Sequence, residues 1–360
     1  MQKTLRVLVI GPAASAENSR GGMATVVSLM LANPAEHTVT ENIATYVDAS
    51  RVRKLWVGVC GLLRASWILS RNGADVLHVH LAHGGSVLRK SVPMAVARCA
   101  GIPVVVHAHS YDFGGWFDTL PRLGRDLVRK VMKADRWLVL GSGLAVEYAT
   151  RLNIDPSTVT VLYNPVSIPA ARADQHDDEP TRIVALGRLG QRKGSFDLID
   201  AVAALPPRTR SRIAVTMCGD GEVDAVRSAA ASAGVAEVVT VAGWTPPEAC
   251  AELLSTAQIF ALPSYSEGLP MALLEAMSHG LVPVCTPVGS VAEAVTTDVD
   301  GVLVQPGAVN ELAAALDMLV WDGVARRRLA DGAREKSAQF DVGLWYDRLD
   351  AIWRDVVRGR

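Results

Sequence analysis

Hydrophobic residues along this chain gather in short continuous runs, separated by longer stretches of helical periodicity. Leu5–Ile10 is one such run, and it stops at Gly11-Pro12, as expected of a buried parallel strand. Strand runs that alternate with helical stretches predict an α/β protein with parallel sheets. The other runs predicted as strands are Val76–Leu81, Val104–His109, Trp137–Leu140, Val159–Leu162, Ile183–Leu186, Ile213–Cys218, Val238–Val241, Ile259–Leu262, Val282–Thr286 and Gly301–Val304.

The alternation is interrupted once, near the middle of the chain. Residues 167–180 (SIPAARADQHDDEP) are polar, bounded by proline and without periodicity, and they predict a linker. The 360 residues are enough for two domains of ordinary size. We therefore predict a first domain over 1–166, a linker over 167–180, a second domain over 181–340 and a terminal helix over 341–360.

Composition and charge narrow the class of protein. Hydrophobic residues make up 49% of the chain and charged residues 20%, which is typical of a globular protein with a large core. The net charge of −1 gives no reason to expect a nucleic acid partner. Residues 1–165 nevertheless hold 18 Lys+Arg against 11 Asp+Glu, whereas 166–360 hold 18 against 26. The basic first half suits an anionic membrane surface or acceptor, and a chance asymmetry between two surfaces explains it equally well.

The cysteines and the start of the chain bear on the compartment. The five cysteines are scattered and form no C-x-x-C pair, which suits a reducing compartment and predicts a cytoplasmic protein. The apolar N-terminus is like a signal peptide, but Gly11-Pro12 cuts the run short, so a first strand is the better interpretation. No apolar run approaches the roughly 18 residues that a spanning helix needs.

The stretch Pro263–Gly280 (PSYSEGLPMALLEAMSHG) carries the strongest candidate chemistry. Loop residues come first, Pro270 suits a first helical position, and Gly280 is expected to end the helix. Backbone N–H groups of Gly268, Leu269 and the first turn would suit an anion, which the helix dipole favours. Glu267 and Glu275 flank this anion site, and carboxylates accept strong hydrogen bonds from hydroxyls. The pattern fits a ligand with hydroxyls near a phosphate.

Two glycine-rich loops follow predicted strands. Gly21-Gly22 lies between the first strand and a helical stretch, the layout of a turn that cradles phosphate, although it is no G-x-G-x-x-G. Residues 187–194 (GRLGQRKG) follow another strand, and arginine and lysine beside glycines suit a diphosphate. Among them Arg188 and Lys193 are the candidate phosphate contacts, whereas Arg192 is assigned to the surface.

Histidines and two amphipathic helices complete the candidates. Two predicted strands, 76–81 and 104–109, each carry a pair of histidines two apart, which places both on one face. A metal site there is the weaker interpretation, because no other ligand type lies near. The apolar residues of 51–70 predict a helix packed on the sheet. Residues 121–136 predict a basic amphipathic helix, which either covers the core with a solvated face or lies on an anionic membrane surface.

These motifs, in this order, resemble the retaining family 4 glycosyltransferases of the GT-B fold. The spacing of Glu267 and Glu275 matches the Glu-x7-Glu signature of that family, and 187–194 resembles its Gly-Arg…Lys-Gly element. The resemblance implies two Rossmann-like domains facing a cleft and a C-terminal helix that crosses back to the first domain. It implies retaining, metal-independent transfer of a hexosyl-type sugar from a nucleotide-diphospho-sugar, with UDP favoured over GDP. The expected acceptor is a glycan or a lipid-linked molecule in cell-envelope or exopolysaccharide synthesis.

The resemblance also assigns roles to individual residues. It implies that Glu267 contacts the transferred sugar and that Arg188 and Lys193 hold the phosphates as they leave. His109, which ends an apolar strand, is implied as the active-site histidine, and His107 as structural. The donor-binding residues that it implies are Gly21, Gly22, Gly219, Trp244, Gly268, Leu269, Pro270 and Glu275. No cofactor and no metal are expected. If the acceptor is lipid-linked, residues 121–136 are the segment predicted to contact an anionic membrane surface.

Two other functions share this architecture. A sugar-nucleotide epimerase would release an altered sugar-nucleotide without an acceptor, and the context EGLPMALLEAMSHG argues against it. A non-catalytic partner subunit would keep the fold and lose catalytic side chains. Arg188, Lys193 and Glu267 are all present, which favours an enzyme.

Overall fold

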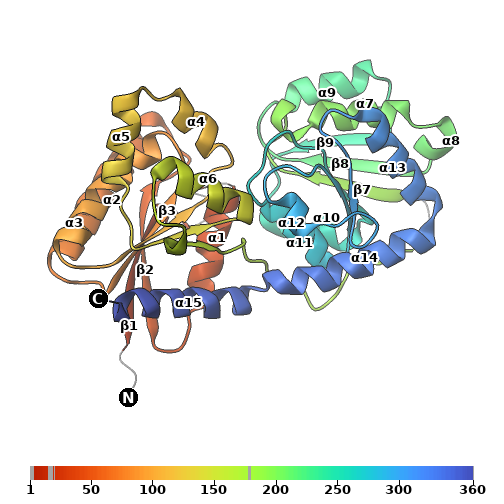
Figure 1. The fold of residues 1–360 in the computed structure, drawn as a ribbon. Coiled ribbons are helices and arrows are strands. Elements are labelled where there is room, and N and C mark those ends of the chain that lie inside the picture. The colour runs from red at the N-terminus through yellow and green to blue at the C-terminus, as the bar shows by residue number, and fades with distance from the viewer. Residues whose placement is uncertain (1–3, 15–18, 20, 177–179, 360) are drawn as a thin grey trace. The chain divides into compact units, whose positions relative to one another are not determined.

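The chain forms two compact units, which a computed structural model describes over residues 4–14, 19, 21–176 and 180–359. Unit 1 comprises residues 1–165 together with 342–360, and unit 2 comprises residues 166–341. Each unit is a parallel six-stranded sheet with helices on its faces (Figure 1). The alternation of apolar runs and helical stretches predicted this class of fold.

The sheet of unit 1 has the strand order β2-β1-β3-β4-β5-β6, and all of its strand pairs are parallel. Its core is dominated by the aliphatic residues of the strands and of the helices packed on them. The strands are β1 (Leu5–Pro12), β2 (Thr38–Tyr46), β3 (Val76–Leu81), β4 (Val104–Ala108), β5 (Arg136–Val139) and β6 (Val159–Val161). The helices are α1 (Gly22–Ala32), α2 (Arg51–Ser70), α3 (Gly85–Cys99), α4 (Phe113–Thr119), α5 (Arg122–Val131), α6 (Ser142–Leu152), η1 (Pro156–Thr158) and α15 (Val342–Arg358).

The last helix of the chain, α15, belongs to unit 1, although all of unit 2 precedes it in sequence. Trp353 is fully buried, and its indole N–H donates to Nδ1 of His78 on β3 at 3.1 Å. The hydroxyl of Thr38 donates to the Asp350 carboxylate at 2.6 Å, which ties α15 to the start of β2. The family resemblance implied that the terminal helix packs on the first domain, and the structure has it there (Figure 1).

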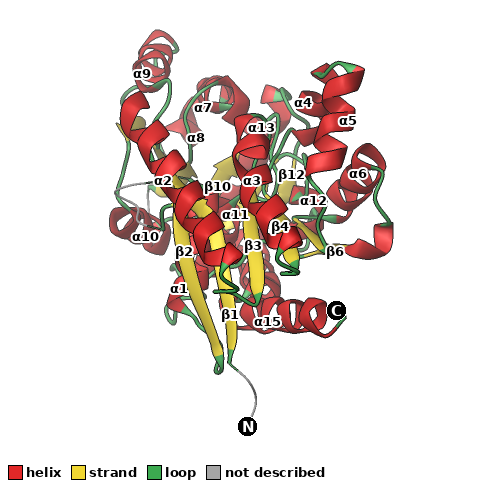
Figure 2. Cartoon of the chain, turned by 90° about the vertical axis from the view of Figure 1, so that its left-hand side faces the viewer, coloured by secondary structure: helices red, strands yellow, loops and turns green. Residues whose placement is uncertain are grey.

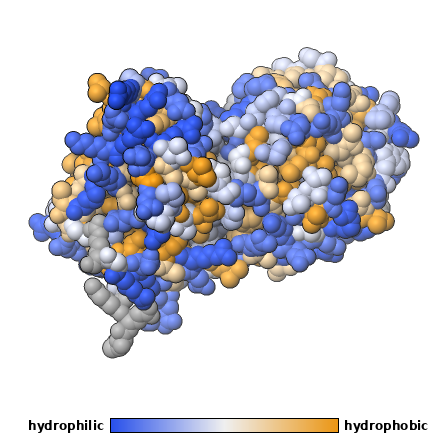
Figure 3. Space-filling view, viewed as in Figure 1, coloured by the Kyte–Doolittle hydropathy of each residue, from blue (hydrophilic) through white to orange (hydrophobic). Residues whose placement is uncertain are grey.

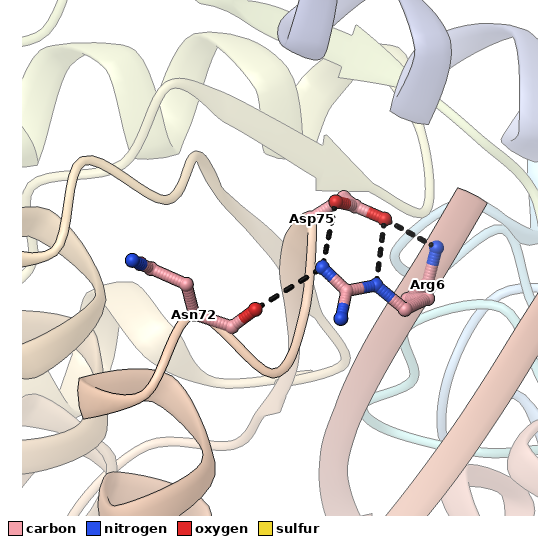
Figure 4. A network of polar contacts seen from close by, with 3 residues as sticks. All are labelled: Arg6, Asn72 and Asp75. Carbon is pink, nitrogen blue, oxygen red and sulfur yellow. Dashed lines mark hydrogen bonds and ion pairs between the residues drawn. The ribbon is translucent and has the colours of Figure 1, made fainter. Parts of the chain in front are cut away.

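Arg6, near the start of β1, is hydrogen-bonded to the turn between α2 and β3 (Figure 4). The Arg6 guanidinium donates to both oxygens of Asp75, at 3.0 and 3.2 Å, and to the carbonyl of Asn72 at 3.1 Å. The backbone N–H of Arg6 donates to the same carboxylate. This bidentate pairing, with its planar geometry, holds the turn between α2 and β3 against the neighbouring strand.

The structure corrects the prediction for two helices of unit 1. The basic helix expected over 121–136 is α5, and it ends at Val131, because β5 already begins at Arg136. In α2, the apolar residues expected against the sheet point to solvent: Leu55 is 69% exposed and Leu63 is 67% exposed. Small residues of α2 face the sheet instead: Gly58, Gly61 and Ala65 are buried.

The sheet of unit 2 has the strand order β12-β11-β10-β7-β8-β9, again all parallel. Its strands are β7 (Thr181–Leu186), β8 (Ile213–Cys218), β9 (Val239–Gly243), β10 (Ile259–Leu262), β11 (Val282–Cys285) and β12 (Val302–Leu303). Its helices are η2 (Gln191–Lys193), α7 (Ser195–Ala204), α8 (Pro207–Arg210), α9 (Val223–Ser232), α10 (Pro247–Thr256), α11 (Met271–His279), α12 (Val291–Ala294), α13 (Val309–Trp321), α14 (Gly323–Ser337) and η3 (Ala338–Phe340).

The strand order reverses once in each sheet, between β1 and β3 in unit 1 and between β7 and β10 in unit 2. In open α/β sheets, ligands bind at such a switch point, beyond the carboxyl ends of the strands. Both glycine-rich loops of the sequence analysis start at these strands, and so does the stretch that begins at Pro263. The topology thus places the candidate chemistry at the expected edge of each sheet.

The segment predicted as a linker lies against unit 2 where the structure describes it. The backbone N–H of Ala173 donates to the carbonyl of His279 at 2.7 Å, and the Gln175 amide donates to Gly280 at 2.9 Å. Residues 177–179 of the predicted linker lie outside the described residues.

Candidate functional site

The loop from Gly187 to Gly194 is pressed against the loop that follows β10. Gly194 has φ of +66°, and a Cβ there would overlap the carbonyl oxygen of Pro263. The Tyr265 N–H donates to the carbonyl of Arg192 at 2.8 Å, which joins the two loops directly. Only glycine allows this approach of two backbones, because it lacks the side chain that would collide. Two stretches separated by some seventy residues of sequence thereby form one surface.

A buried ion pair lies where these loops meet. Nζ of Lys193 is 2.6 Å from Oε1 of Glu267, and their side chains are 14% and 7% exposed. The Arg192 guanidinium donates to the carbonyl of Ser266 at 2.8 Å and lies 3.5 Å from the same carboxylate oxygen. Two cations thus surround one carboxylate, so these three side chains together carry one net positive charge. That balance suits an anionic ligand.

Arg188 takes a different position from Lys193, although both lie on the same loop. Its side chain is 70% exposed, and its guanidinium lies 3.7 Å from the Asp220 carboxylate. An exposed arginine at this separation gains little from the pair and can reorient toward a ligand. The structure thus brings Lys193 to Glu267 and leaves Arg188 extended from the rim of the loop.

The ends of β7, β8 and β9 are joined by backbone contacts at the same edge. Gly219, with φ of +151°, lies so close to Gly187 that a Cβ would overlap its carbonyl oxygen. Its N–H donates to the carbonyl of Gly243 at 2.7 Å. Trp244 follows directly and is 45% exposed. The predicted donor residues Gly219 and Trp244 therefore flank the loop that carries Arg188 and Lys193.

The helix predicted to begin at Pro270 is α11, and it begins one residue later, at Met271, with Pro270 as its N-cap. Gly280 ends it with φ of +78°, as predicted. Leu269 is buried, and the Gly268 carbonyl accepts a hydrogen bond from the Ser290 N–H at 2.8 Å. These contacts fix the chain between Glu267 and the helix N-terminus.

Glu275 lies on α11, just over one turn into the helix, and is partly buried. Desolvation raises the pKa of its carboxyl from 4.5 to about 7. Among the described residues, no side chain pairs with this carboxyl, while the backbone carbonyl of Glu275 accepts from Ser278 and His279. A half-desolvated carboxyl without a cation is suited to accept hydrogen bonds from ligand hydroxyls.

Unit 1 contributes a cluster of four histidines from β3 and the end of β4. His78, His80 and His107 are fully buried, and His109 is partly exposed at the carboxyl end of β4. Nδ1 of His80 lies 2.9 Å from Nε2 of His109, and their rings stack. Burial lowers the pKa of all four rings, that of His107 to about 3. The cluster is therefore neutral at physiological pH, and His109 is its member nearest to solvent.

The buried rings also have the spacing of a metal site. One ring nitrogen from each of His78, His80 and His107 lies within 4.8 Å of the others. Trp353, however, donates to Nδ1 of His78, which places the proton of the neutral ring on Nε2. His78 then has no lone pair left for an ion. Two hydrogen bonds order the cluster, one from Trp353 to His78 and one between His80 and His109, whereas neither ring nitrogen of His107 has a hydrogen-bond partner among the described residues.

Gly21 and Gly22, the other predicted donor residues of unit 1, lie between β1 and α1. Gly22 is the first residue of α1, and Gly21 precedes it with φ of +102°. The neighbouring Arg20 of this loop lies outside the described residues. Gly21 and Gly22 thus occupy the turn at the helix N-terminus that the sequence analysis assigned to phosphate binding.

The predicted residues thus fall into two sets. Unit 2 groups Arg188, Lys193, Gly219, Trp244, Glu267, Gly268, Leu269, Pro270 and Glu275 at one edge of its sheet, and unit 1 holds Gly21, Gly22 and His109 at the corresponding edge of its own. The sequence analysis assigned Arg192 to the surface, and it noted the histidine pair of 76–81 without linking His80 to His109. The position of Arg192 directly before Lys193 was the available signal.

Comparison with known proteins agrees with this description. The family model of Glycosyltransferase Family 4 matches residues 18–168, and that of glycosyl transferases group 1 matches residues 169–336. The border between the two matches lies close to the division between the compact units. One family model thus matches most of the part of unit 1 that precedes unit 2, and the other matches most of unit 2.

Relatives of known name are glycosyltransferases as well. A D-inositol 3-phosphate glycosyltransferase of Corynebacterium aurimucosum is 30% identical over 57% of this chain, and the match spans about half of that relative, 51%. A putative teichuronic acid biosynthesis glycosyltransferase of Bacillus subtilis is 26% identical over 79% of this chain and 71% of its own length.

Solved structures show the fold. HepE of Anabaena, crystallised with UDP and glucose, superposes with a TM-score of 0.76 over 98% of this chain and 100% of its own, at 16% identity. This match confirms the predicted fold of two Rossmann-like domains. Taken together, two adjacent family matches over residues 18–336, the relatives and the shared fold show that this chain belongs to the family 4 glycosyltransferases.

Proposed function

We propose that this protein is a retaining glycosyltransferase. It moves a hexosyl-type sugar from a nucleotide-diphospho-sugar, with UDP favoured over GDP, to a glycan or a lipid-linked acceptor. The observation that carries the proposal is the Lys193–Glu267 pair at the switch point of unit 2, with Arg192 beside it and Arg188 at the rim. It supplies cations for a diphosphate and a carboxylate for sugar hydroxyls in one place.

Each residue has a proposed role that follows from its position. Arg188, which is exposed enough to reorient, and Lys193 offset the negative charge that develops as the diphosphate leaves. Glu267 contacts the hydroxyls of the transferred sugar, and Glu275 accepts hydrogen bonds from the ribose. Stabilisation by side-chain cations serves the role that a metal plays elsewhere, so we propose a metal-independent reaction without a cofactor.

The remaining predicted residues serve donor binding and transfer. Gly219, Trp244, Gly268, Leu269 and Pro270 shape the nucleotide side of the site through their backbones. In unit 1, Gly21 and Gly22 offer a helix N-terminus to the donor, and His109 acts on the sugar. The neutral His80 ring holds His109 in one orientation.

The setting of the reaction follows from the relatives. The named Bacillus subtilis protein is assigned to teichuronic acid biosynthesis, and the Anabaena structure contains UDP and glucose. These names support a role in cell-envelope or exopolysaccharide synthesis and a uridine nucleotide. We also propose peripheral contact with an anionic membrane surface through residues 121–136, where four Lys or Arg of α5 accompany one aspartate.

Thermal unfolding with a panel of UDP-, GDP- and ADP-sugars, with and without EDTA, tests the donor. A ligand at 100 times its dissociation constant adds about 2.7 kcal/mol to the free energy of unfolding. We expect one nucleotide to raise the melting temperature, independently of EDTA, and the effect to vanish in Arg188→Ala and Glu275→Ala. An altered sugar-nucleotide released without acceptor would identify an epimerase, and no shift with any nucleotide would favour a non-catalytic subunit.

A further inference from the structure

Most of the large apolar residues of helix α2 face solvent, and small residues face the sheet. Its outer face carries Val52, Leu55, Trp56, Val59, Leu63 and Trp67, whose side chains are between 47% and 80% exposed. They recur at intervals of three and four residues over nearly the whole helix, so they form one stripe. Hydrophobic residues exposed singly are ordinary, whereas a contiguous stripe indicates a binding surface.

The inner face of α2 explains why the large residues are outside. Gly61 lies so close to β2 that a Cβ would overlap the carbonyl oxygen of Ala44. Gly58 and Ala65 are buried beside it, one turn away on either side. This close approach leaves no room for a large side chain at positions 58, 61 and 65, so the large apolar residues of this part of α2 face outward, whereas Leu69 is buried near the end of the helix.

The stripe continues across the helices beside α2. Helix α3 packs alongside α2 and exposes Leu88 at 63% and Val92 at 53%. Helix α5, next to α3, exposes Leu123 at 84% and Leu127 at 51%. Figure 2 shows α2 and α3 side by side in front of the unit 1 sheet. We name this surface of α2, α3 and α5 the outer face.

The charge of the outer face selects its partner. The three helices contain eleven Lys or Arg, of which Lys90 is buried, and a single acidic residue, Asp126. On α2, the exposed Arg51 and Arg53 lie at the start of the stripe, and the Arg71 guanidinium lies 4.8 Å from the ring of Trp67 at its end. Figure 3 shows hydrophilic residues with scattered hydrophobic ones over the part of unit 1 where α5 lies.

We propose that the outer face docks on an anionic lipid surface, with the α2 stripe inserted among the headgroups and acyl chains. Tryptophan and leucine are suited to this depth, and the surrounding arginines bind lipid phosphates. A second copy of this chain is disfavoured, because two such basic faces repel each other. No helix in the described part of the chain is long and apolar enough to cross a bilayer.

This inference deepens the proposed membrane contact, and it moves the inserting element from 121–136 to α2. Residues 121–136 then add charge at the border of the outer face. Docking through α2 would hold unit 1 at the surface where a lipid-linked acceptor resides. It requires no transfer activity, so it can fail or succeed independently of the proposed reaction.

Sedimentation with vesicles of phosphatidylcholine, with and without phosphatidylglycerol, tests the inference on the full chain. We expect binding only to the anionic vesicles, with a blue shift of tryptophan emission, and weaker binding as salt rises. The double variant Trp56→Ser/Trp67→Ser should bind at least about tenfold more weakly. Arg51→Glu/Arg53→Glu should lose a similar factor.

Matched controls separate docking from damage to the fold. Val146→Ser on α6 and Val324→Ser on α14 remove side chains that are 69% and 72% exposed outside the outer face, and should bind as the unchanged protein does. All variants should keep the same melting temperature and the same shift with the nucleotide-sugar. Equal binding to neutral vesicles, no loss in the tryptophan variants, or self-association that those variants abolish would overturn the proposal.

Discussion

At the scale of single residues, the pair of Lys193 and Glu267 is the most consequential contact of the candidate site. We expect Lys193→Met to lower the free energy of unfolding by about 1.5–3 kcal/mol, because a charged hydrogen bond is lost while the carboxylate stays largely buried. Arg192 remains 3.5 Å from the carboxylate, which keeps the loss below that of a wholly unpaired charge. Urea unfolding measures the change.

The double variant Lys193→Met/Glu267→Gln distinguishes the pair from mere packing. It should recover part of the stability lost in Lys193→Met, since the stranded charge is gone. Transfer activity should be reduced by roughly 100-fold or more in both variants. The exposed Lys133→Met serves as control for stability and should leave the free energy of unfolding unchanged. Equal stability of the single variant and the unchanged protein would contradict the structural role of the pair.

Glu275 should make stability depend on pH. The pKa of its carboxyl is about 7 in the folded chain against 4.5 as the ordinary value, so the folded state binds the proton more strongly. Its contribution to the free energy of unfolding therefore falls as pH rises from about 4.5 to 7 and stays low above. We expect Glu275→Gln to gain about 2 kcal/mol over the unchanged protein between pH 5 and pH 8, a value reduced for partial exposure.

Urea unfolding at the two pH values checks this expectation. Glu252→Gln on α10, which is exposed, is the matched control and should follow the unchanged protein. Parallel pH profiles for Glu275→Gln and the unchanged protein would show that the carboxyl titrates normally. If Glu275 binds ribose as a carboxylate, donor affinity should also rise with pH toward 8, and this rise should disappear in the variant.

At the scale of elements, the loop between β7 and α7 depends on a residue without a side chain. We expect Gly194→Ala to lower the free energy of unfolding by about 2 kcal/mol or more, because its Cβ would overlap Pro263 and its φ of +66° disfavours alanine. Donor binding should fall with it, since the two loops that form the site separate. Thermal unfolding with and without nucleotide measures both effects.

A matched control exists for this substitution. Gly143, near the start of α6, is helical and has open space around its Cβ position. Gly143→Ala should be neutral or slightly stabilising, because alanine is the better helix former. A Gly194→Ala variant with the stability and nucleotide response of the unchanged protein would mean that the loops adapt without the close approach.

The elements show which parts of the fold and site could be predicted from the sequence. Most strands of the sheets follow from their apolar runs. β2 was missed because its sequence, TVTENIATY, alternates with polar residues. The prediction that the large apolar residues of α2 face the sheet was wrong, because Gly58 and Gly61 occupy the contact with the sheet instead. The link from His80 to His109 depends on the register of β3 against β4, which periodicity along one strand does not reveal.

At the scale of the whole molecule, the order of the chain differs from the order of its compact units. Unit 1 is completed by α15, which follows unit 2 in sequence. Terminal residues often fray, but Leu349 and Trp353 of α15 are fully buried. The resemblance to a known family predicted this placement. Composition and periodicity alone could not predict it, because they show that the helix has an apolar face but not which domain that face packs against.

The last prediction follows from that division. A fragment of residues 166–341 contains a complete sheet and core, and should unfold cooperatively by itself. A fragment of residues 1–165 lacks α15 and with it the buried side chains of Trp345, Leu349 and Trp353. His78 then loses the hydrogen bond that it accepts from Trp353. Truncating one such tryptophan alone costs about 3–5 kcal/mol, so losing the whole helix exceeds the stability of a typical domain. We expect this fragment to show no cooperative transition.

Joining residues 342–358 to residue 165 by a flexible linker should restore cooperative unfolding of unit 1. The same linked chain with Trp353→Ser should show a smaller recovery, because the buried indole contributes apolar area and the hydrogen bond to His78. Leu344→Ser, which alters an exposed position of the same helix, is the matched control. Near-ultraviolet circular dichroism and urea unfolding would measure the recovery. Cooperative unfolding of 1–165 without α15 would show that the helix is an attachment to unit 1 and that the sheet is stable without it.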